Sequence, residues 1–221
     1  MKSPFDLVVF DVGGVLVQAG RTWLEDAERA GFHVSPAELA QLEGRTRALP
    51  RRTTGTIDSE RYFMLFAEAS GGVYTVDDAR RISRASLIAE YSGVSRVFDA
   101  LDAANVPTAI LCNVNDEEWS RYFPPSPLDS EFPTLARAHY RFASHLMGFA
   151  KPDAYVFREV ERITGFPGTS ILFFDDREEN IAGAQACGWT AHLIDYTRDD
   201  TAEQILGFLQ THAVVPSDAH P

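Results

Sequence analysis

The strongest constraint on the fold of this chain is a short apolar run, LVVF at residues 7–10, which ends in one carboxylate, Asp11. A short, β-branched run closed by a polar residue is typical of a strand that is buried on both faces. Apolar runs of the same kind recur at residues 107–112, 170–174 and 190–194, with helical patterns between them. Strands that alternate with helices favour a parallel sheet covered by helices on both sides. We therefore expect a three-layer α/β protein.

The segment from residue 20 to residue 93 interrupts this alternation, because it has helical patterns and no clear strand. In one of these patterns Ser35 is the expected N-cap and Pro36 the first helical residue. We interpret the segment as a helical cap, inserted between the first and second core strands, with hinges near 17–20 and 92–95. The expected helices are 21–31, 35–49, 57–72, 75–93, 94–106, 151–165, 179–188 and 201–211, and a further short strand is 140–144. The expected organisation is an α/β core at 1–19 and 94–212, the cap at 20–93, and a loose tail at 213–221.

Charge and hydropathy exclude two classes of partner. The formal net charge is −12, whereas a nucleic-acid backbone is bound by a basic surface, and the one dense basic run, 47–52, is too short for that role. No apolar stretch approaches the ~20 residues that span a bilayer. We also do not expect the first residues to form a signal peptide. The two cysteines, Cys112 and Cys187, lie far apart without a CxxC pair. We expect a cytoplasmic protein with reduced thiols, bound neither to nucleic acid nor to a membrane.

Polar residues follow three of the expected strands at the points where these strands end. In an open α/β sheet, ligands bind at the carboxyl ends of the strands, so these residues are expected to meet at one edge. A lysine near the start of a helix is within reach of the same edge. The candidate residues are Asp11, Cys112, Asn113, Asp175, Asp176 and Lys151.

Three carboxylates at one edge repel one another unless a cation compensates them. Oxygen ligands in small number suit Mg²⁺, which often holds substrate phosphate as well. Gly13 and Gly14, directly after the first strand, leave backbone N–H groups open toward an anion. Because a carboxylate can attack phosphorus and form an aspartyl-phosphate, these features together indicate phosphoryl transfer on Asp11.

Four sequence motifs resemble those of the haloacid dehalogenase (HAD) superfamily, and the resemblance covers nearly the whole chain. VVFDVGGVL is similar to the first motif, AILCNVN to the second, GFAKPDAYVF to the third and ILFFDDREENIAGAQACGW to the fourth. The cap lies where this family carries its small helical cap. The nearest likeness is to sugar-phosphate phosphatases and to the phosphatase domain of soluble epoxide hydrolase. The resemblance implies a Rossmann-like core and a HAD-like hydrolase.

The resemblance also implies a role for each candidate residue. Asp11 would be the nucleophile, and Lys151 would bridge it to the phosphate. Mg²⁺ would be held by Asp11, the backbone carbonyl of Gly13 and Asp176, with Asp175 nearby. Cys112 and Asn113 occupy the phosphate-binding second motif. Asn180 and Gly14 would support the site.

Two positions depart from the family pattern. Most phosphatases of the superfamily carry a second aspartate two residues after the nucleophile, which protonates the leaving group, and this chain has Gly13 there. The second motif has Cys112 in place of serine or threonine, and a thiol is a weak hydrogen-bond donor. The main hypothesis is a Mg²⁺-dependent phosphatase that acts on a small phosphorylated metabolite, with sugar phosphates among the candidate substrates. The protein is expected to be a monomer or a homodimer. Leaving groups that need no proton, such as acyl or anomeric phosphates, would suffer least from Gly13.

Two alternatives stay open. A 2-haloacid dehalogenase also uses an aspartate nucleophile without the second aspartate, although it needs no metal. A lapsed enzyme would bind a phospho-ligand or a protein partner without turnover. A phospho-receiver domain is disfavoured, because there the acidic pair precedes the phosphorylated aspartate.

The cap is expected to choose the substrate. Arg47, Arg51 and Arg52 are candidates for contact with a distal anion or sugar, against the alternative of a solvated helix end. Trp119 and Tyr122 are candidates for lining the site or for packing.

Overall fold

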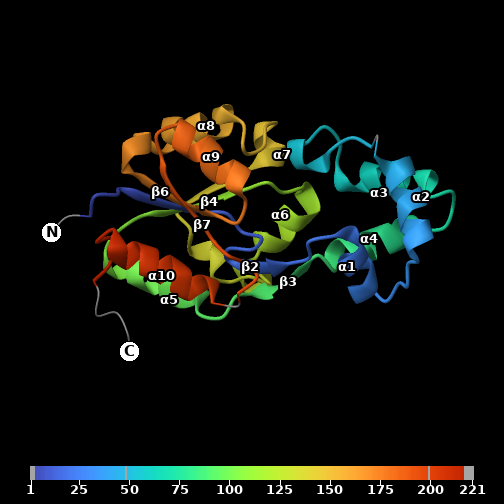
Figure 1. Cartoon of the computed structure of the whole chain (residues 1–221), viewed down its shortest axis with the longest axis horizontal. Coiled ribbons are helices and arrows are strands. Elements are labelled where there is room, and N and C mark those ends of the chain that lie inside the picture. The colour runs from blue at the N-terminus through green and yellow to red at the C-terminus, as the bar shows by residue number, and fades with distance from the viewer. Residues whose placement is uncertain (1–2, 48, 199, 217–221) are drawn as a thin grey trace.

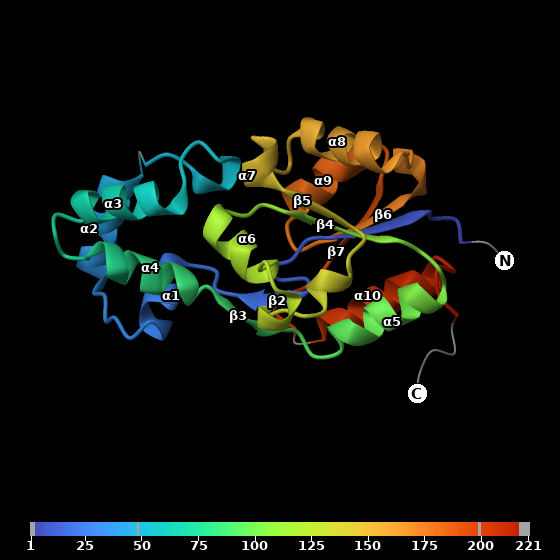
Figure 2. The ribbon, with the colours of Figure 1, turned by 180° about the vertical axis from the view of Figure 1, so that it is seen from behind.

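The computed structural model describes residues 3–47, 49–198 and 200–216. A five-stranded sheet forms its centre, with strands in the order β5-β4-β1-β6-β7 and every neighbouring pair parallel. Helices α8 and α9 lie on one face of the sheet and α5 and α10 on the other (Figures 1 and 2). The predicted three-layer α/β fold with a parallel sheet is therefore confirmed.

The strands are β1 (Leu7–Phe10), β2 (Val17–Ala19), β3 (Leu87–Glu90), β4 (Thr108–Cys112), β5 (Tyr140–Ala143), β6 (Ile171–Asp175) and β7 (Thr190–Leu193). The α-helices are α1 (Trp23–Arg29), α2 (Pro36–Thr46), α3 (Ser59–Ala69), α4 (Val76–Arg84), α5 (Val94–Ala103), α6 (Asp116–Tyr122), α7 (Ser144–Met147), α8 (Ala154–Thr164), α9 (Glu178–Ala186) and α10 (Thr201–Thr211). Short 3₁₀ turns are η1 (Arg52–Thr54), η2 (Pro127–Asp129), η3 (Leu135–Arg137) and η4 (Gly168–Ser170). No helix in these described ranges is long and apolar enough to cross a membrane.

Strand β1 is the middle of the core, and all four of its residues are buried. Successive side chains of a strand point to opposite faces, so β1 joins two apolar clusters. Val8 and Phe10 belong to the cluster on the side of α5 and α10, whereas Leu7 and Val9 belong to the cluster with α8. This burial on both faces explains why the strand reads as an uninterrupted apolar run.

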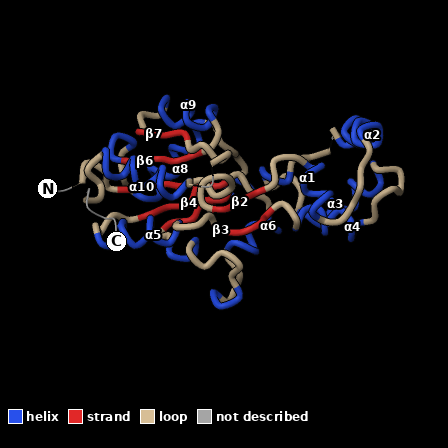
Figure 3. Tube along the Cα trace, turned by 60° about the horizontal axis from the view of Figure 1, so that its bottom comes forward, coloured by secondary structure: helices blue, strands red, loops and turns tan. Residues whose placement is uncertain are grey.

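Helices α1 to α4 of the cap lie together beyond the carboxyl edge of the sheet (Figures 1 and 3). They share an apolar cluster of their own, which includes Phe63, Phe66 and Ile82. Helix α2 begins as expected, with Ser35 as its N-cap. The Ser35 side chain accepts a hydrogen bond from the Glu38 backbone N–H, and the Glu38 carboxylate accepts one from the Ser35 backbone N–H. Such a capping box satisfies two N–H groups that the helix leaves open.

The expectation that residues 20–93 contain no strand is wrong, because β3 lies within them. Helix α4 ends at Arg84, and β3 then pairs antiparallel with β2. The hydrogen bonds from Gly20 N–H to the Ser86 carbonyl and from Tyr91 N–H to the Leu16 carbonyl extend this pairing. A partner about 70 residues away in the sequence thus overrides a local helical pattern.

The expected loose tail is wrong for its first part. Val214 and Val215 are buried in the same apolar cluster as Phe5. The Val214 N–H donates to the Leu209 carbonyl, which folds the chain back against the end of α10. Two adjacent valines gain more from covering apolar surface than from staying in solvent. The remainder of the predicted tail, 217–221, lies outside the described residues.

Candidate active site

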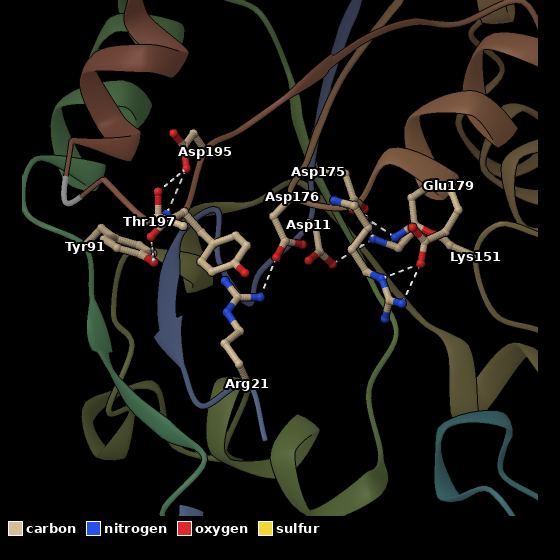
Figure 4. Close-up of polar contacts among 12 residues, drawn as sticks. Asp11, Arg21, Tyr91, Lys151, Asp175, Asp176, Glu179, Asp195 and Thr197 are labelled. Atoms are coloured by element: carbon tan, nitrogen blue, oxygen red, sulfur yellow. Dashed lines mark hydrogen bonds and ion pairs between the residues drawn. The ribbon is translucent and has the colours of Figure 1, made fainter. Parts of the chain in front are cut away.

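The carboxyl edge of β1, β4 and β6 brings the sequence candidates together. Asp11 follows β1, Asp175 ends β6, and Asp176 comes next. One carboxylate oxygen from each of the three lies within 4.8 Å of the others. This proximity follows from the register, since β1 pairs with β6 from Leu7 opposite Ile171 to Phe10 opposite Phe174. Figure 4 shows the cluster with the Lys151 side chain beside it.

Lys151 is buried at the centre of this cluster. Its ammonium group donates to Asp11 Oδ1 at 2.7 Å, to Asp175 Oδ2 at 2.6 Å and to the Leu111 carbonyl at 2.7 Å. Three donors therefore have three acceptors, which is the condition under which a buried ammonium is tolerated. Burial alone would lower the pKa of Lys151, but the charges of Asp11 and Asp175 outweigh it and hold the pKa above its usual value.

Asp11 has an unusual titration for an aspartate. Burial, followed by repulsion from Asp175 and Asp176, raises its pKa to about 7, although the Lys151 ammonium opposes the rise. The Lys151 ammonium therefore does not fully offset the burial and the repulsion that disfavour the charged form of Asp11. An additional positive charge at this edge would stabilise the carboxylate that a nucleophilic role requires.

Two asparagines fix the groups around Lys151. The Asn113 side chain is bound at both ends, since its Nδ2 donates to the Lys151 carbonyl at 2.9 Å and its Oδ1 accepts from the Lys151 N–H at 2.8 Å. Asn180 donates to Asp175 Oδ1 at 2.8 Å, and the Arg177 N–H donates to the same oxygen at 2.9 Å. Asp175 is fully buried, so these bonds hold it in one orientation.

Asp176 pairs with a residue that sequence reasoning missed. The Arg21 guanidinium, from the beginning of the cap, forms an ion pair with Asp176 Oδ2 at 2.5 Å (Figure 4). The same guanidinium lies over the Tyr196 ring. Burial raises the pKa of Asp176, and Arg21 opposes the rise. Gly14 is required beside this pair: its φ is +83°, and a Cβ there would meet the Arg21 and Asp176 side chains. An arginine two residues after β2 carries no sequence signal of its own.

A cavity of about 210 Å³ opens at this edge. Its lining includes most of the predicted site residues, namely Asp11, Gly13, Cys112, Asn113, Lys151, Asp176 and Asn180. Tyr122 lines it as well, and so does Glu118, a second residue that sequence reasoning missed. Trp119 instead packs against Phe123, with ring centroids 4.5 Å apart.

A second cavity, of about 170 Å³, lies between the cap and α6. It shares four lining residues with the first, Gly20, Arg21, Ser86 and Glu118, and aromatic side chains of the cap form much of its wall. We call the first the core cavity and the second the cap cavity. Only one of the three predicted cap arginines lies at a cavity. Arg52 lines the cap cavity, with its guanidinium over the Tyr62 ring, whereas Arg47 and Arg51 are exposed and line neither the core cavity nor the cap cavity.

The donor set fits a hard divalent cation. Three clustered carboxylates supply only oxygen ligands, which Mg²⁺ prefers. Burial raises the pKa of Asp11 and of Asp176, and neighbouring carboxylates add to both rises, so a bound cation would stabilise their charged forms. The one thiol in the core cavity, Cys112, is buried, and burial together with the Asp11 charge raises its pKa well above the usual value, which keeps it neutral.

A parallel sheet with these layers and an acidic carboxyl edge defines the class of open α/β proteins that bind ligands outside the strand ends. Residues 5–188 match the haloacid dehalogenase-like hydrolase family. The chain therefore belongs to this hydrolase family, and the predicted membership of the superfamily is confirmed.

Individual relatives agree with this assignment. A phosphatase of Mycobacterium tuberculosis, MT3486, is 35% identical over 66 residues, which are 28% of this chain and 30% of that protein. This alignment thus spans about a third of the curated relative's length. A solved structure of a predicted HAD-like hydrolase from Porphyromonas gingivalis has a TM-score of 0.74 at 22% identity, over 94% of this chain and 99% of that one.

A HAD family enzyme of Bacteroides thetaiotaomicron, solved in complex with magnesium and inorganic phosphate, has a TM-score of 0.69 at 18% identity. The match covers 89% of this chain and 97% of that one. Both structural likenesses establish the fold.

Proposed function

We propose that this protein is a Mg²⁺-dependent phosphatase that hydrolyses a small phosphorylated metabolite through an aspartyl-phosphate on Asp11. The observation that carries the proposal is the arrangement of Asp11, Lys151, Asp175 and Asp176 around one small cavity at the carboxyl edge of the sheet. Such an edge is suited to an anion that carries several charges, because a lysine and a cation-binding carboxylate set lie side by side.

In the first step the free carboxylate oxygen of Asp11 attacks phosphorus, and the bond between phosphorus and the leaving-group oxygen breaks. Lys151 already holds the other oxygen, Asp11 Oδ1, at 2.7 Å, which orients the nucleophile and neutralises part of the phosphoryl charge. In the second step water attacks phosphorus, the bond to Asp11 breaks, and inorganic phosphate is released. Asn113 and Asp175 keep Lys151 in place throughout.

Asp11, Asp176 and the backbone carbonyl of Gly13 would hold Mg²⁺, which when bound supplies electrostatic stabilisation of the phosphoryl oxygens. The support for this ligand set is that Asp11, Gly13 and Asp176 all line the core cavity. Asp175 is committed to Lys151, Asn180 and the Arg177 N–H, and so it positions its neighbours.

The cap cavity suggests the substrate class. Trp23, Tyr62, Phe63 and Phe66 give it aromatic walls, and Arg52 and Glu118 add polar groups. Aromatic faces with a few hydrogen-bonding groups suit a sugar or another compact polyol better than a long apolar chain. We therefore propose that the leaving group is a small polar metabolite such as a sugar.

The test is phosphate release from a panel of sugar phosphates, acyl phosphates and 4-nitrophenyl phosphate. Each substrate is assayed with Mg²⁺ and with EDTA, and beside the variant Asp11→Asn, which keeps the shape of the side chain but lacks the nucleophilic carboxylate. Release that requires both Mg²⁺ and Asp11 is expected. Release that survives in EDTA or in the variant would contradict the proposed chemistry.

Two other results would redirect the assignment. Halide release from chloroacetate without metal would favour the dehalogenase alternative. If no substrate is turned over but inorganic phosphate binds in the presence of Mg²⁺, the protein is a binder that has lost turnover. Calorimetry with phosphate as the titrant distinguishes this case from simple inactivity.

A further inference from the structure

Phosphate ester hydrolysis at this site lacks an obvious proton donor. Position 13 is glycine, so no side chain there can protonate the leaving-group oxygen. Among the described residues, three carboxyl groups line the core cavity: Asp11, Asp176 and Glu118. Asp11 is the proposed nucleophile and Asp176 is paired with Arg21, which leaves Glu118 as the candidate acid.

Glu118 occupies the boundary between the two cavities. It lines both the core cavity and the cap cavity, together with Gly20, Arg21 and Ser86. A substrate whose phosphoryl group is at Asp11 and whose leaving group extends toward the cap therefore passes Glu118. The oxygen that joins the two parts faces away from Asp11 during an in-line attack, toward this boundary.

The backbone of Glu118 is rigidly placed. Glu118 is the third residue of α6, and its N–H donates to the side chain of the N-cap, Asn115, at 3.0 Å. Asn115 is buried, and the neighbouring Asp116 accepts from the N–H and the hydroxyl of Ser59 at the start of α3. The first turn of α6 is thereby fixed to both core and cap, as an acid in a defined position requires.

The surroundings of Glu118 favour a carboxyl that holds its proton. Burial raises its pKa above the usual value, although Arg52 from η1 and hydrogen bonds with Asn115 oppose the rise, and Glu117 on the same helix adds to it. The other charged or titratable groups that line its two cavities are Asp11, Arg21, Asp26, Tyr62, Cys112, Tyr122, Lys151, Asp176 and Arg177. Glu118 in turn helps to raise the pKa of Cys112 and of Tyr122, after burial as the main cause, so its carboxyl lies near the end of β4.

We propose that Glu118 is the general acid and base of this phosphatase, in the role left vacant by Gly13; this rests on the proposed function. As Asp11 attacks and the phosphorus–oxygen bond of the ester breaks, the Glu118 proton goes to the leaving oxygen and gives the free alcohol. The Glu118 carboxylate then takes a proton from the attacking water as the bond between phosphorus and Asp11 breaks. One ester and one water thus yield one alcohol and one phosphate, and Glu118 regains its proton.

The experiment compares two leaving groups in Glu118→Gln, with Glu43→Gln on α2 as the matched control, since Glu43 is exposed and lines neither cavity. General acid catalysis contributes about 10²–10⁴-fold, and only where the leaving group needs a proton. For the best alkyl phosphate of the panel, kcat/KM, which reports phosphoryl transfer to Asp11 and release of the alcohol, is expected to fall about 100-fold or more in Glu118→Gln. For 4-nitrophenyl phosphate, kcat/KM should fall less than about threefold, because nitrophenolate leaves without a proton. Glu43→Gln should match the wild type on both.

A rescue experiment adds a readout that a merely structural role would not move. A Cβ at Gly13 would meet only Ala19 Cβ, at the ordinary distance of 3.6 Å, and the backbone there does not have a positive φ, so a side chain can be introduced at this position. Gly13→Asp added to Glu118→Gln is expected to restore at least about tenfold of the lost alkyl phosphate turnover. The alkaline fall of kcat/KM for the alkyl phosphate should also disappear in Glu118→Gln.

Each other outcome is decisive as well. An equal loss of kcat/KM on both substrates, or no loss on either, would overturn the role of Glu118 while the phosphatase assignment stands. Failure of Gly13→Asp to restore turnover in a folded double variant would also count against it. A wild-type protein that releases no phosphate from either substrate would overturn the proposed function and this inference together.

Discussion

The Asp11 carboxyl should destabilise the metal-free protein as it ionises. Its native pKa of about 7 exceeds the ordinary 3.8, so between these values the native state holds a proton that the unfolded state has lost. The free energy of unfolding therefore falls as pH rises through this window and levels off above pH 7. At about 1.4 kcal/mol per pKa unit, the full effect is about 4 kcal/mol, of which about 3 kcal/mol falls between pH 5 and pH 8.

The perturbation is Asp11→Asn, which removes the titration but keeps the side-chain shape. Urea unfolding, followed by tryptophan fluorescence in EDTA, gives the free energy of unfolding of wild type and variant at pH 5 and pH 8. The difference between the two proteins isolates Asp11 from all other titrating groups. The variant is expected to gain about 3 kcal/mol relative to the wild type over this interval. The exposed Asp129→Asn serves as the control and should show no such gain.

Addition of Mg²⁺ should reduce this effect, because a cation at the acidic edge compensates the Asp11 charge. A difference between wild type and Asp11→Asn that is the same at pH 5 and pH 8 would refute the reasoning. It would mean that Lys151 alone compensates the buried carboxylate.

Three further predictions concern the same edge. Lys151→Met should lower the free energy of unfolding by about 3–5 kcal/mol at pH 8, because Asp11 and Asp175 lose their shared partner, and by less at pH 5; urea titrations measure both. Gly14→Ala should cost about 2 kcal/mol through its positive φ and the clash beside it, whereas Gly13→Ala should change stability by less than about 1 kcal/mol; thermal melts of the pair decide. Mg²⁺ at about 100 times its Kd should stabilise the wild type by about 2.7 kcal/mol, which is visible as a rise in Tm, and excess EDTA should reverse this rise.

The candidate site was accessible from the sequence because strand ends are local features. A short apolar run that stops at a polar residue marks both a buried strand and the residue at its carboxyl end. Parallel pairing then brings Asp11, Asp175 and Cys112 to one edge whatever the strand order. The sequence therefore indicated which residues meet, although their roles in catalysis stay predictions.

Other features depend on long-range contacts that leave no local pattern. Strand β3 follows a helix and pairs with a segment about 70 residues earlier, so periodicity alone extended α4 through it. Arg21 and Glu118 have no motif, and they reach the site only because β2 ends and α6 begins beside the sheet edge. Among the cap arginines, the sequence could not separate Arg52 from its exposed neighbours, because the turn η1 decides which one faces the cavity.

The structure also distinguishes two aspartates that are adjacent in the sequence. Asp175 is fully buried, and its two oxygens accept from Lys151, Asn180 and the Arg177 N–H. Asp176 lines the core cavity, and its described partner is Arg21, a side chain from the cap. A cation bound at this edge would have to compete with that guanidinium for Asp176, but not with Lys151 for Asp175. Metal binding at Asp176 is thus expected to affect the attachment of the cap, whereas Asp175 serves the internal rigidity of the site.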